Sequence, residues 1–582
     1  MNGFKRRLLV LISIICVLFL VDIISLFKLQ ILDNEKYFVL SEKNRIRTRP
    51  IFPIRGEIYD RNDIKIAINA PIYRLMLINS KKENDILKTV NTLRNIVDIK
   101  QTDAEIIAKS KLMAVNSCIC LKDTLTWDDY VKLTLHILDL NNIVMDCVYT
   151  RAYVDPLAIG HILGYVGANQ NNEAYIEGKS GIEYSQNNTL FGAFGNKKVE
   201  VNSKMQFVRT LDYVKPIDGE SIKLTIDIKL QKYIYNLLSA HNAASCVVIN
   251  LENGHVLGAV SVPGIDTNMM SRKISYNEWD KILNNKYLPM NNRIFRTLYS
   301  PGSVFKVFLA YSALVAGKIT PQEKIKCNGF TALGKDKFRC WKHSGHGAVN
   351  LYQAIACSCD VYFHEVAKRM GIEAIGNSAN TFSFGQCVCD DISNELKGLV
   401  PNKKWKKERF HKEWKEYDTI FIGTGQGYLL TNIMQIATGI SRIATGNSDF
   451  TPTLLFNKNG NLSSPDLNKD ALDIVKQAMY QVCNTALGTA HRSCKTDYGI
   501  AGKTGSTQVR KLRAGEHGKS QDLLKWEDRD HALFAGFAPY KSPKYAVAVI
   551  VEHGGGGSHT AAPVARKIFD WLIYEYDTKN KK

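Results

Sequence analysis

The sequence has no Cys-x-x-Cys pair, no internal repeat, no zinc-finger array and no helix-turn-helix or RNA-binding signature. Nucleic acid is the first partner to consider for a chain with a net charge of +20, but none of its usual recognition motifs is present. The basic residues are also spread along the chain and accompanied by 56 acidic residues. We therefore expect no nucleic-acid partner. An anionic surface, either lipid headgroups or an acidic polymer, fits the charge better.

Long hydrophobic runs are also scarce, because only Leu8 to Phe27 is about long enough to span a membrane. Asp22 is the only charge inside this run, and three basic residues at 5–7 precede it. The positive-inside rule then places the N-terminus in the cytoplasm. A cleavable signal peptide is the alternative, but it would have a shorter apolar core followed by small residues. We expect an uncleaved anchor, with everything after Lys28 outside the cytoplasmic membrane.

The length of 582 residues predicts two or three domains, and 45% hydrophobic residues are ordinary for a globular protein. Residues 1–30 would be a cytoplasmic stub and transmembrane anchor. Residues 31–235 mix short strands with helical patterns and contain no catalytic grouping, which indicates a non-catalytic spacer domain. Residues 240–578 would form the catalytic domain, an α+β fold in which early strands (245–250, 255–262) and late strands (531–537, 544–552) build a sheet with helices between.

The first candidate catalytic residues are Ser303 and Lys306, which follow a Pro-Gly turn at the start of an apolar run. Residues at i and i+3 share a helix face, so the amine can reach the hydroxyl and activate it as a nucleophile. A second copy of the Ser-x-x-Lys motif begins at Ser25, at the edge of the membrane anchor, and we expect no catalytic role for it. The alternative for Ser303 alone is a helix-capping serine.

Two further boxes lie downstream, Ser358-Cys359-Asp360 and Lys503-Thr504-Gly505-Ser506. Ser358 falls in a segment, Leu351 to Met370, with helical apolar spacing, and it could relay protons; the alternative is a hydroxyl bonded to its own backbone. The Lys503 box has the pattern of an edge strand along which a substrate could approach the backbone, and the alternative is a surface turn. Burial and the second ammonium of Lys503 would both disfavour the charged form of Lys306.

The order and spacing of the three boxes, 55 residues from Ser303 to Ser358 and 200 from Ser303 to Lys503, are those of penicillin-interacting serine enzymes. The chain resembles the class B, monofunctional penicillin-binding proteins, most closely the elongation-specific penicillin-binding protein 2 group. The supporting segments are Arg55–Ile58 with Asp60–Asn62, Gly181–Glu183, Trp341–Gly347 and Gly425–Tyr428. The resemblance implies an elongated pedestal (dimerisation-like) domain before a transpeptidase domain with an antiparallel sheet flanked by helices.

The resemblance also implies roles in peptidoglycan D,D-transpeptidation. Ser303 would be the acyl-ester nucleophile, Lys306 its base, and Ser358 and Lys503 catalytic partners. The substrate-binding residues would be Asp360, Thr504, Gly505 and Ser506. Asp360 departs from the asparagine of most of the wider superfamily, which leaves the charge of the site open.

The rival functions are a D,D-carboxypeptidase or β-lactamase, a septal transpeptidase, and a non-catalytic β-lactam sensor or scaffold. The first of these passes the acyl group to water. A sensor would usually need further membrane spans or a cytoplasmic output domain.

The partners implied are peptidoglycan stem peptides, β-lactams as covalent inhibitors, the membrane, a SEDS-type glycosyltransferase and an elongation scaffold. The chain would lie in the cell inner membrane as a single-pass protein with its catalytic domain in the periplasm.

One group of the thirteen cysteines differs from the others, because Cys327, Cys340, His346 and Cys359 surround the second box with C-x12-C-x5-H-x12-C spacing. Three thiolates and an imidazole form a closed tetrahedral zinc set. Some penicillin-binding proteins 2 resemble this arrangement and hold a metal with acidic, His and Cys ligands here. Catalysis requires no cofactor, so a zinc ion would be structural. The alternatives are buried small hydrophobes or a Cys327–Cys340 disulfide.

Overall fold

A computed structural model describes residues 2–80, 82–113, 117–136, 140, 142–169, 176–202, 207–272, 274–460, 462, 466–510 and 521–576. The chain forms two compact units. The first comprises Met1–Arg55, Ala70–Thr150 and Phe191–Glu220, and the second comprises Gly56–Asn69, Arg151–Leu190 and Ser221–Lys582.

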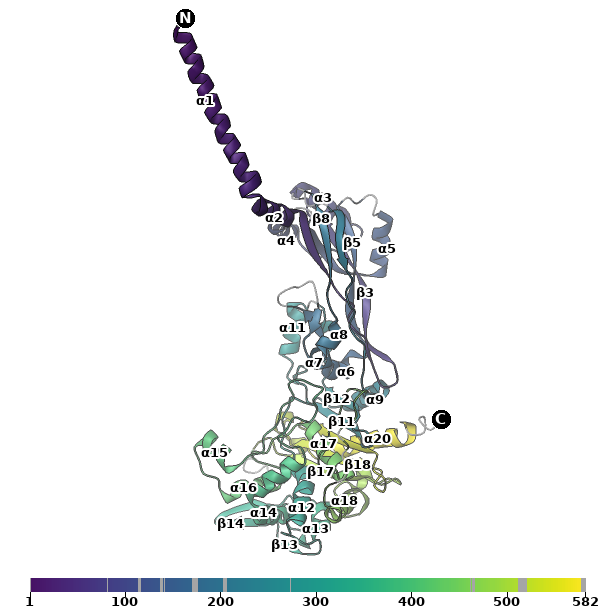
Figure 1. Cartoon of the computed structure of the whole chain (residues 1–582). Coiled ribbons are helices and arrows are strands. Elements are labelled where there is room, and N and C mark those ends of the chain that lie inside the picture. The colour runs from purple at the N-terminus through teal and green to yellow at the C-terminus, as the bar shows by residue number, and fades with distance from the viewer. Residues whose placement is uncertain are drawn as a thin grey trace. The chain divides into compact units, whose positions relative to one another are not determined.

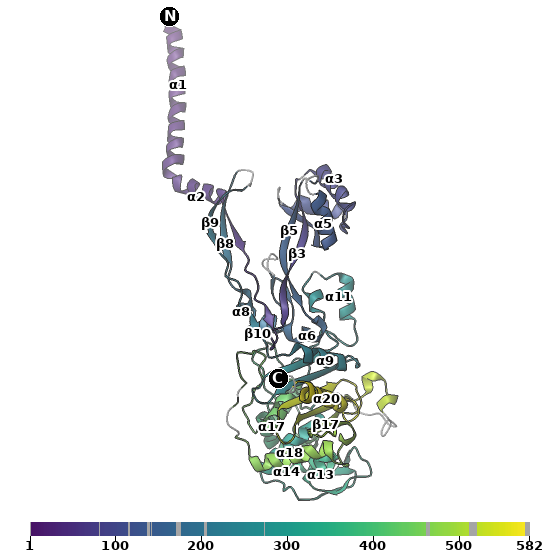
Figure 2. The same ribbon diagram turned by 90° about the vertical axis from the view of Figure 1, so that its right-hand side faces the viewer.

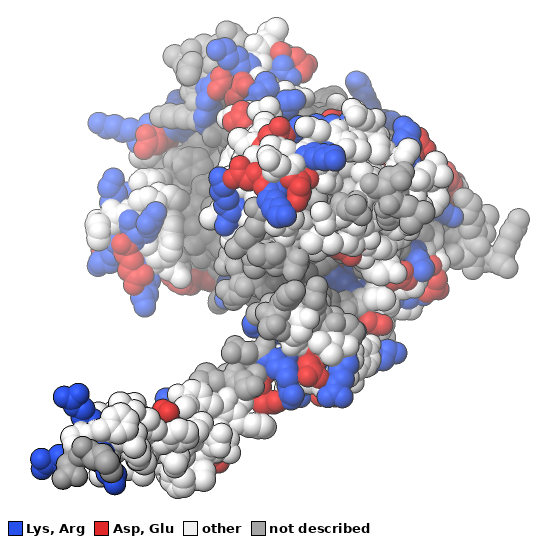
Figure 3. All heavy atoms as spheres, turned by 90° about the horizontal axis from the view of Figure 1, so that it is seen from above, with Lys and Arg blue, Asp and Glu red and all other residues white. Residues whose placement is uncertain are grey.

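The first unit begins with the long apolar helix predicted from the sequence. Helix α1 (Asn2–Phe27) continues through a π-helical turn (Lys28–Leu32), and the stretch Gly3–Leu32 is long and apolar enough to cross a membrane. Figure 3 shows a largely uncharged surface along this helix, with basic residues at its end. Helix α2 (Asn34–Arg45) then leads into a three-stranded antiparallel sheet, β1 (Ile46–Ile51), β8 (Gly195–Val201) and β9 (Phe207–Val214).

A separate hydrophobic core within the first unit includes Leu75, Val90 and Leu121. It is built by strands and helices whose apolar positions recur with the period of each element. These elements are β3 (Lys65–Ile78), β4 (Cys118–Leu125), β5 (Ile143–Tyr153), α3 (Glu83–Arg94), α4 (Asp103–Leu112) and α5 (Trp127–His136). The start of β3, at residues 65–69, belongs to the second unit, where it pairs with β2 (Ile58–Tyr59), which in turn pairs with β10 (Ile222–Lys223).

The second unit is organised around a five-stranded antiparallel sheet with the order β12-β11-β19-β18-β17 (Figure 1). The predicted early and late strands meet in its centre, because β11 pairs along its whole length with β19. The strands are β11 (Ala244–Asn250), β12 (Val256–Val262), β17 (Ala501–Thr507), β18 (His531–Ala538) and β19 (Tyr545–Val551). The α+β fold class predicted from the sequence is therefore confirmed.

Helices cover this sheet on both faces, since every residue of β11, β12 and β19 is buried. Helices α9 (Ile228–Leu238) and α20 (Ala561–Asp570) pack on the sheet and on each other, and α17 (Ile433–Thr445) packs across β11, β18 and β19 (Figure 2). The closing helix ends in a π-helical segment, Trp571–Tyr576.

A second helical layer lies against strand β17 at the end of the sheet. It consists of α12 (Phe305–Val315), α13 (Leu351–Ala356), α14 (Asp360–Thr381), α16 (Glu416–Gly423) and α18 (Lys469–Asn484). Helix α18 packs directly on β17, and α12 packs on both α14 and α18. The three sequence boxes that contain Ser303, Ser358 and Lys503 are carried by the elements of this layer and by β17.

Short elements complete the second unit. Two small hairpin-like pairs precede α13, namely β13 (Ile325–Cys327) with β16 (Gly347–Val349), and β14 (Phe330–Leu333) with β15 (Asp336–Arg339). The remaining elements are α6 (Pro156–Leu163), β6 (Val166–Ala168), β7 (Ile176–Gly178), α7 (Gly181–Ser185), α10 (Thr267–Met270), α11 (Tyr276–Leu283), α15 (Lys403–Phe410) and α19 (His491–Cys494). Helix α8 (Asn187–Phe191) spans the boundary between the units.

Candidate active site

Ser303 lies in a single 3₁₀ turn, Gly302–Val304, that leads directly into α12. Gly302 has a positive φ of 56°, which glycine adopts without the strain of other residues. Ser303 is half-buried, whereas Lys306, one turn later, is fully buried among apolar residues of α12. The sequence correctly placed this pair at the start of a buried helix.

The buried side-chain amine of Lys306 makes three polar contacts with the second box. Its Nζ donates to the Ser358 carbonyl oxygen at 3.0 Å, to Ser358 Oγ at 3.3 Å and to Asp360 Oδ1 at 2.7 Å. The sequence argument considered only burial and a neighbouring cation. The structure adds the Asp360 carboxylate as a direct anionic partner of this amine.

Ser358 does not lie within a continuous helix, which corrects the expectation for Leu351 to Met370. Helix α13 ends at Ala356 and α14 begins at Asp360, and Ser358 between them has a φ of 56°. The apolar spacing persists across the break, so periodicity could not reveal it. The break lets both the carbonyl oxygen and the hydroxyl of Ser358 face Lys306.

Lys503 approaches the same hydroxyl from the edge strand β17. Its Nζ donates to Ser358 Oγ at 2.9 Å and to the Thr504 carbonyl oxygen at 2.9 Å. Burial lowers the pKa of Lys503 well below its usual value of 10.5, and the nearby charge of Lys306 lowers it further. The Ser358 hydroxyl therefore lies between two buried amines, an arrangement that can pass a proton in either direction.

Asp360 is oriented by two contacts at once. Oδ1 pairs with Lys306, and Oδ2 accepts a hydrogen bond from the backbone N–H of Trp341 at 2.9 Å. Burial alone would raise the pKa of Asp360, but the Lys306 charge and these hydrogen bonds outweigh it and hold the pKa below 3.8. Both oxygens of the Asp360 carboxylate are thus engaged within the protein.

The other residues of the third box have distinct surroundings. Thr504 Oγ1 hydrogen-bonds Thr489 Oγ1 at 2.7 Å, a partner that the sequence did not indicate. Ser506 is exposed, and its carbonyl oxygen accepts from Gln426 Nε2 at 3.2 Å. A Cβ at Gly505 would lie 3.2 Å from Val304 Cγ2. The missing side chain of Gly505 therefore makes room for the turn that carries Ser303.

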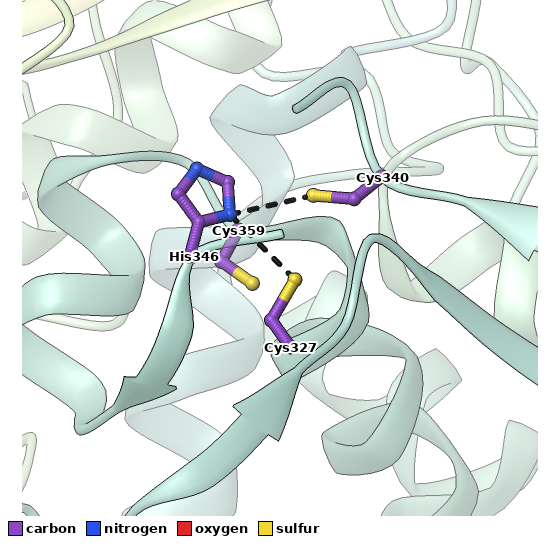
Figure 4. A group of neighbouring side chains, drawn as sticks. All are labelled: Cys327, Cys340, His346 and Cys359. Atoms are coloured by element: carbon purple, nitrogen blue, oxygen red, sulfur yellow. Dashed lines mark hydrogen bonds between the residues drawn. The ribbon is translucent and has the colours of Figure 1, made fainter. Parts of the chain in front are cut away.

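The four predicted metal ligands come together beside the second box (Figure 4). The ligand atoms of Cys327, Cys340, His346 and Cys359 all lie within 4.8 Å of one another. The Nδ1 atom of His346 faces Cys340 Sγ at 3.5 Å and Cys327 Sγ at 3.7 Å. Tetrahedral Zn–S bonds of about 2.3 Å would separate the ligand atoms by roughly 3.7 Å, so the set fits a zinc ion.

The contact between Cys340 and Cys359 favours the thiolate at one of the two residues. A hydrogen bond with Cys359 lowers the pKa of Cys340 to about 5, and the same contact raises the pKa of Cys359. Thiolate is the form that binds metals. All thirteen cysteines are free thiols in the structure, so the alternative disulfide between Cys327 and Cys340 is not formed.

Comparisons with known proteins agree with this geometry. Residues 244–570 match the family described as penicillin binding protein transpeptidase domain, and residues 50–224 match the penicillin-binding protein dimerisation domain. A transpeptidase domain combined with a dimerisation domain defines class B, and the chain belongs to these penicillin-binding proteins. The resemblance inferred from the three boxes is confirmed.

The chain is similar to relatives over nearly its whole length. It is 34% identical to the peptidoglycan D,D-transpeptidase MrdA of Salmonella typhimurium (strain SL1344), over 98% of this chain and 96% of the relative. Identity to the MrdA of Escherichia coli (strain K12) is 33%, over 98% and 94% of the two chains. A solved complex of penicillin-binding protein PBP2 with MreC from Helicobacter pylori has a TM-score of 0.80 at 30% identity, covering 91% of this chain and 99% of that one.

Proposed function

We propose that the chain is a peptidoglycan D,D-transpeptidase that cross-links stem peptides through a serine acyl-enzyme during cell elongation. The observation that carries this proposal is the position of Ser358 Oγ, 3.3 Å from Lys306 Nζ and 2.9 Å from Lys503 Nζ. Lys306 in turn lies one helical turn after Ser303. The relatives named as MrdA D,D-transpeptidases support the same activity.

In the acylation step, Ser303 Oγ would attack the carbonyl carbon of the D-Ala–D-Ala peptide bond. Lys306 in its uncharged form takes the hydroxyl proton, and the C–N bond breaks. The departing amine of the terminal D-alanine receives a proton through Ser358, which links Lys306 to Lys503. Because Ser358 Oγ contacts both amines, it can accept a proton on one side while donating on the other.

In the second step, an amine of a neighbouring strand would attack the acyl-enzyme ester. The ester C–O bond breaks, a new amide forms, and the proton released by the amine returns to Ser303. The substrate-binding residues in this proposal are Asp360, Thr504, Gly505 and Ser506, together with the side-chain amine of Lys503 for the terminal carboxylate of the stem peptide. Ser506 supports an approach along β17, since it is exposed on the edge strand.

Labelling with a fluorescent penicillin tests the nucleophile. We expect covalent label on the wild-type chain and none on Ser303→Ala, whereas label retained by this variant would refute the assignment. Product analysis with and without an amine acceptor then separates transpeptidation from carboxypeptidation, which passes the acyl group to water. Depletion in cells separates the elongation role, which gives round cells, from a septal role, which gives filaments.

The N-terminal helix supports a single-pass anchor. We propose that residues 1–30 form the cytoplasmic stub and anchor, residues 31–235 the pedestal, and residues 240–578 a catalytic domain on the periplasmic side of the inner membrane. The basic residues at 5–7 support this orientation, since positive charge favours the cytoplasmic side. Protease accessibility of the catalytic domain in spheroplasts, but not in intact cells, is the expected result.

We also propose that Cys327, Cys340, His346 and Cys359 hold a structural zinc ion. Zinc would supply only cross-linking of the segments around the second box, because all four tetrahedral positions are filled by protein ligands. Elemental analysis should find one zinc per chain, and Cys327→Ser should lose it with a fall in thermal stability. A metal-free wild-type chain and an unaffected Cys327→Ser variant would contradict this role.

Partners follow from the elongation assignment. The solved complex of a similar PBP2 with MreC supports an elongation scaffold as one partner, and we propose a SEDS-type glycosyltransferase as another. Co-purification of each partner with the full-length chain from membranes is the direct test, with the helix-deleted chain as the comparison.

A further inference from the structure

The side chain of Tyr299, four residues before Ser303, contacts the ion pair between Arg293 and Glu552, which the proposed mechanism does not use. Its phenolic O–H donates to Glu552 Oε1 at 2.7 Å. Glu552 also accepts two hydrogen bonds from Arg293, Nε to Oε1 at 2.9 Å and one terminal nitrogen to Oε2 at 3.1 Å. Arg293 and Tyr299 are 2% and 4% exposed, and the Glu552 side chain is 13% exposed, so the three groups are largely sheltered from water.

The charges around this phenol keep it a hydrogen-bond donor. Burial would raise the pKa of Glu552, but the Arg293 guanidinium outweighs it and lowers the pKa. Burial and the Glu552 charge raise the pKa of Tyr299 well above 10. His531, whose ring contacts Tyr299 edge-on at 5.6 Å, has its pKa lowered to about 4, chiefly by burial. At neutral pH a protonated phenol therefore faces a carboxylate.

The chain between Tyr299 and Ser303 is held from outside at successive residues. The backbone N–H and carbonyl of Tyr299 both pair with Thr431 at 2.8 Å. The Ser300 carbonyl oxygen accepts from Thr507 Oγ1 at 2.8 Å. The N–H of Gly302 donates to the Gly425 carbonyl oxygen at 2.8 Å. The Tyr299–Glu552 bond is the only side-chain hydrogen bond that this segment itself donates among the described contacts.

We propose that Tyr299 is a positioning residue for the nucleophile, a role that rests on the proposed function. Its hydrogen bond to Glu552 fixes the start of the turn, and the rigid turn then holds Ser303 in register with Lys306. A misplacement of reacting atoms by about 1 Å can cost on the order of 100-fold in rate. A buried ion pair contributes little net stability, but it can fix one orientation of the groups around it.

A pair of matched tyrosine variants tests this role. Tyr299→Phe removes the phenol that binds Glu552. Tyr311→Phe removes another phenol, which accepts a hydrogen bond from the Asn468 N–H at 2.8 Å and lies on the same helix as Lys306. Each variant removes only a phenolic hydroxyl, which in Tyr299 contacts Glu552 and Thr297, but only Tyr299 adjoins the turn of Ser303. The readouts are the non-covalent binding constant of a fluorescent penicillin, the acylation rate constant and the melting temperature.

We expect Tyr299→Phe to lower the acylation rate constant about 10-fold, with the non-covalent binding constant unchanged. Tyr311→Phe should keep the wild-type rate at a similar melting temperature. Equal rate constants in the two variants would overturn the proposal, as would a joint loss of binding and rate that follows the melting temperature. Absence of label on the wild-type chain would instead refute the proposed function.

A second position keeps the test decisive if Tyr299→Phe fails to fold. Thr507→Val removes the hydroxyl that holds the Ser300 carbonyl from β17, and Thr507→Ser restores it. The same pattern is expected, a lower acylation rate constant for the valine variant and rescue by serine. A valine variant that acylates as fast as the serine variant would show that the hold on the turn does not set the acylation rate, and positioning through the turn would be refuted.

Discussion

At the scale of single residues, the hydroxyl of Ser358 contacts the buried amines of both Lys306 and Lys503. Ser358→Ala removes the only group that contacts both Lys306 Nζ and Lys503 Nζ among the described contacts. We expect a fall of on the order of 100-fold or more in the penicillin acylation rate, because positioned proton transfer contributes factors of this size. Stopped-flow measurement of acylation checks it.

The matched control for this prediction is Ser378→Ala. Ser378 is a buried serine of α14 whose hydroxyl binds the Phe308 carbonyl oxygen and Ser312, away from both amines. It should lose some stability and keep its acylation rate. An equal rate loss in both variants would mean that the Ser358 effect comes from folding and not from proton transfer.

Asp530 gives a prediction about pH and stability. Burial raises its pKa from 3.8 to about 6. The folded state therefore keeps a proton that the unfolded state releases, so stability should fall as the pH rises from about 4 to about 6. Asp530→Asn cannot lose this proton, and Gln521, which contacts both the backbone and the side chain of Asp530, can still bond the amide.

The measurement is the melting temperature of both chains across this pH range. The gain of Asp530→Asn over the wild type should be small near pH 4 and should grow until about pH 6. A constant difference across the range would contradict the prediction, since it would show that the folded and unfolded carboxyl groups titrate alike.

At the scale of elements, the turn before α12 packs against a second turn that contains Gly425. Gly425 has a φ of 71°, and a Cβ there would lie 2.1 Å from the Gly302 carbonyl oxygen. Gly425→Ala must therefore displace the nucleophile turn or unfold it locally. We expect loss of most penicillin labelling, measured at equal protein concentration by gel fluorescence.

Gly317→Ala is the control for this substitution. Gly317 follows α12, has a φ of 62°, and offers open space where a Cβ would stand. Gly317→Ala should lower the free energy of unfolding by about 1 kcal/mol, because alanine is strained at positive φ, but it causes no steric collision. Labelling should persist in this variant, and equal loss in both would show that backbone strain alone explains the effect at Gly425.

The sequence predicted those parts of the site that are written in short contiguous motifs. Ser303 and Lys306 share one helical turn, and the Lys503 box has the pattern of a strand, so local rules place them correctly. The break at Ser358 was missed because the apolar spacing of α13 and α14 continues across it. The Thr489–Thr504 contact and the pairing of Asp360 with Lys306 depend on packing between distant segments, which no local pattern encodes.

At the scale of the whole molecule, the N-terminal helix and the α+β fold class followed from composition and periodicity, but the interleaving of segments between the two units did not. Each unit draws on three stretches of sequence. Local patterns identify strands but not their partners. The sequence therefore predicted only that early and late strands form one sheet, and not that β11 pairs with β19.

Deletion of residues 1–32 is predicted to release the chain from membranes without loss of penicillin labelling. The apolar window of the N-terminal helix is 0% buried against the described remainder of the chain, so its removal takes away no core contacts. Membrane fractionation followed by labelling of the soluble fraction checks both parts. A deleted chain that still sediments with membranes would indicate another attachment.

Strand β17 touches the nucleophile turn at two alternate positions, Gly505 and Thr507, and touches the proton-relay serine through Lys503. A displacement of β17 would therefore move Ser303 and its proposed proton relay, Ser358, together. In the proposed function the stem peptide approaches along this strand at Ser506, its exposed residue, so peptide binding would act on the same strand that holds the turn of Ser303. A ligand that separates β17 from β18 should therefore lower the penicillin acylation rate without contacting Ser303.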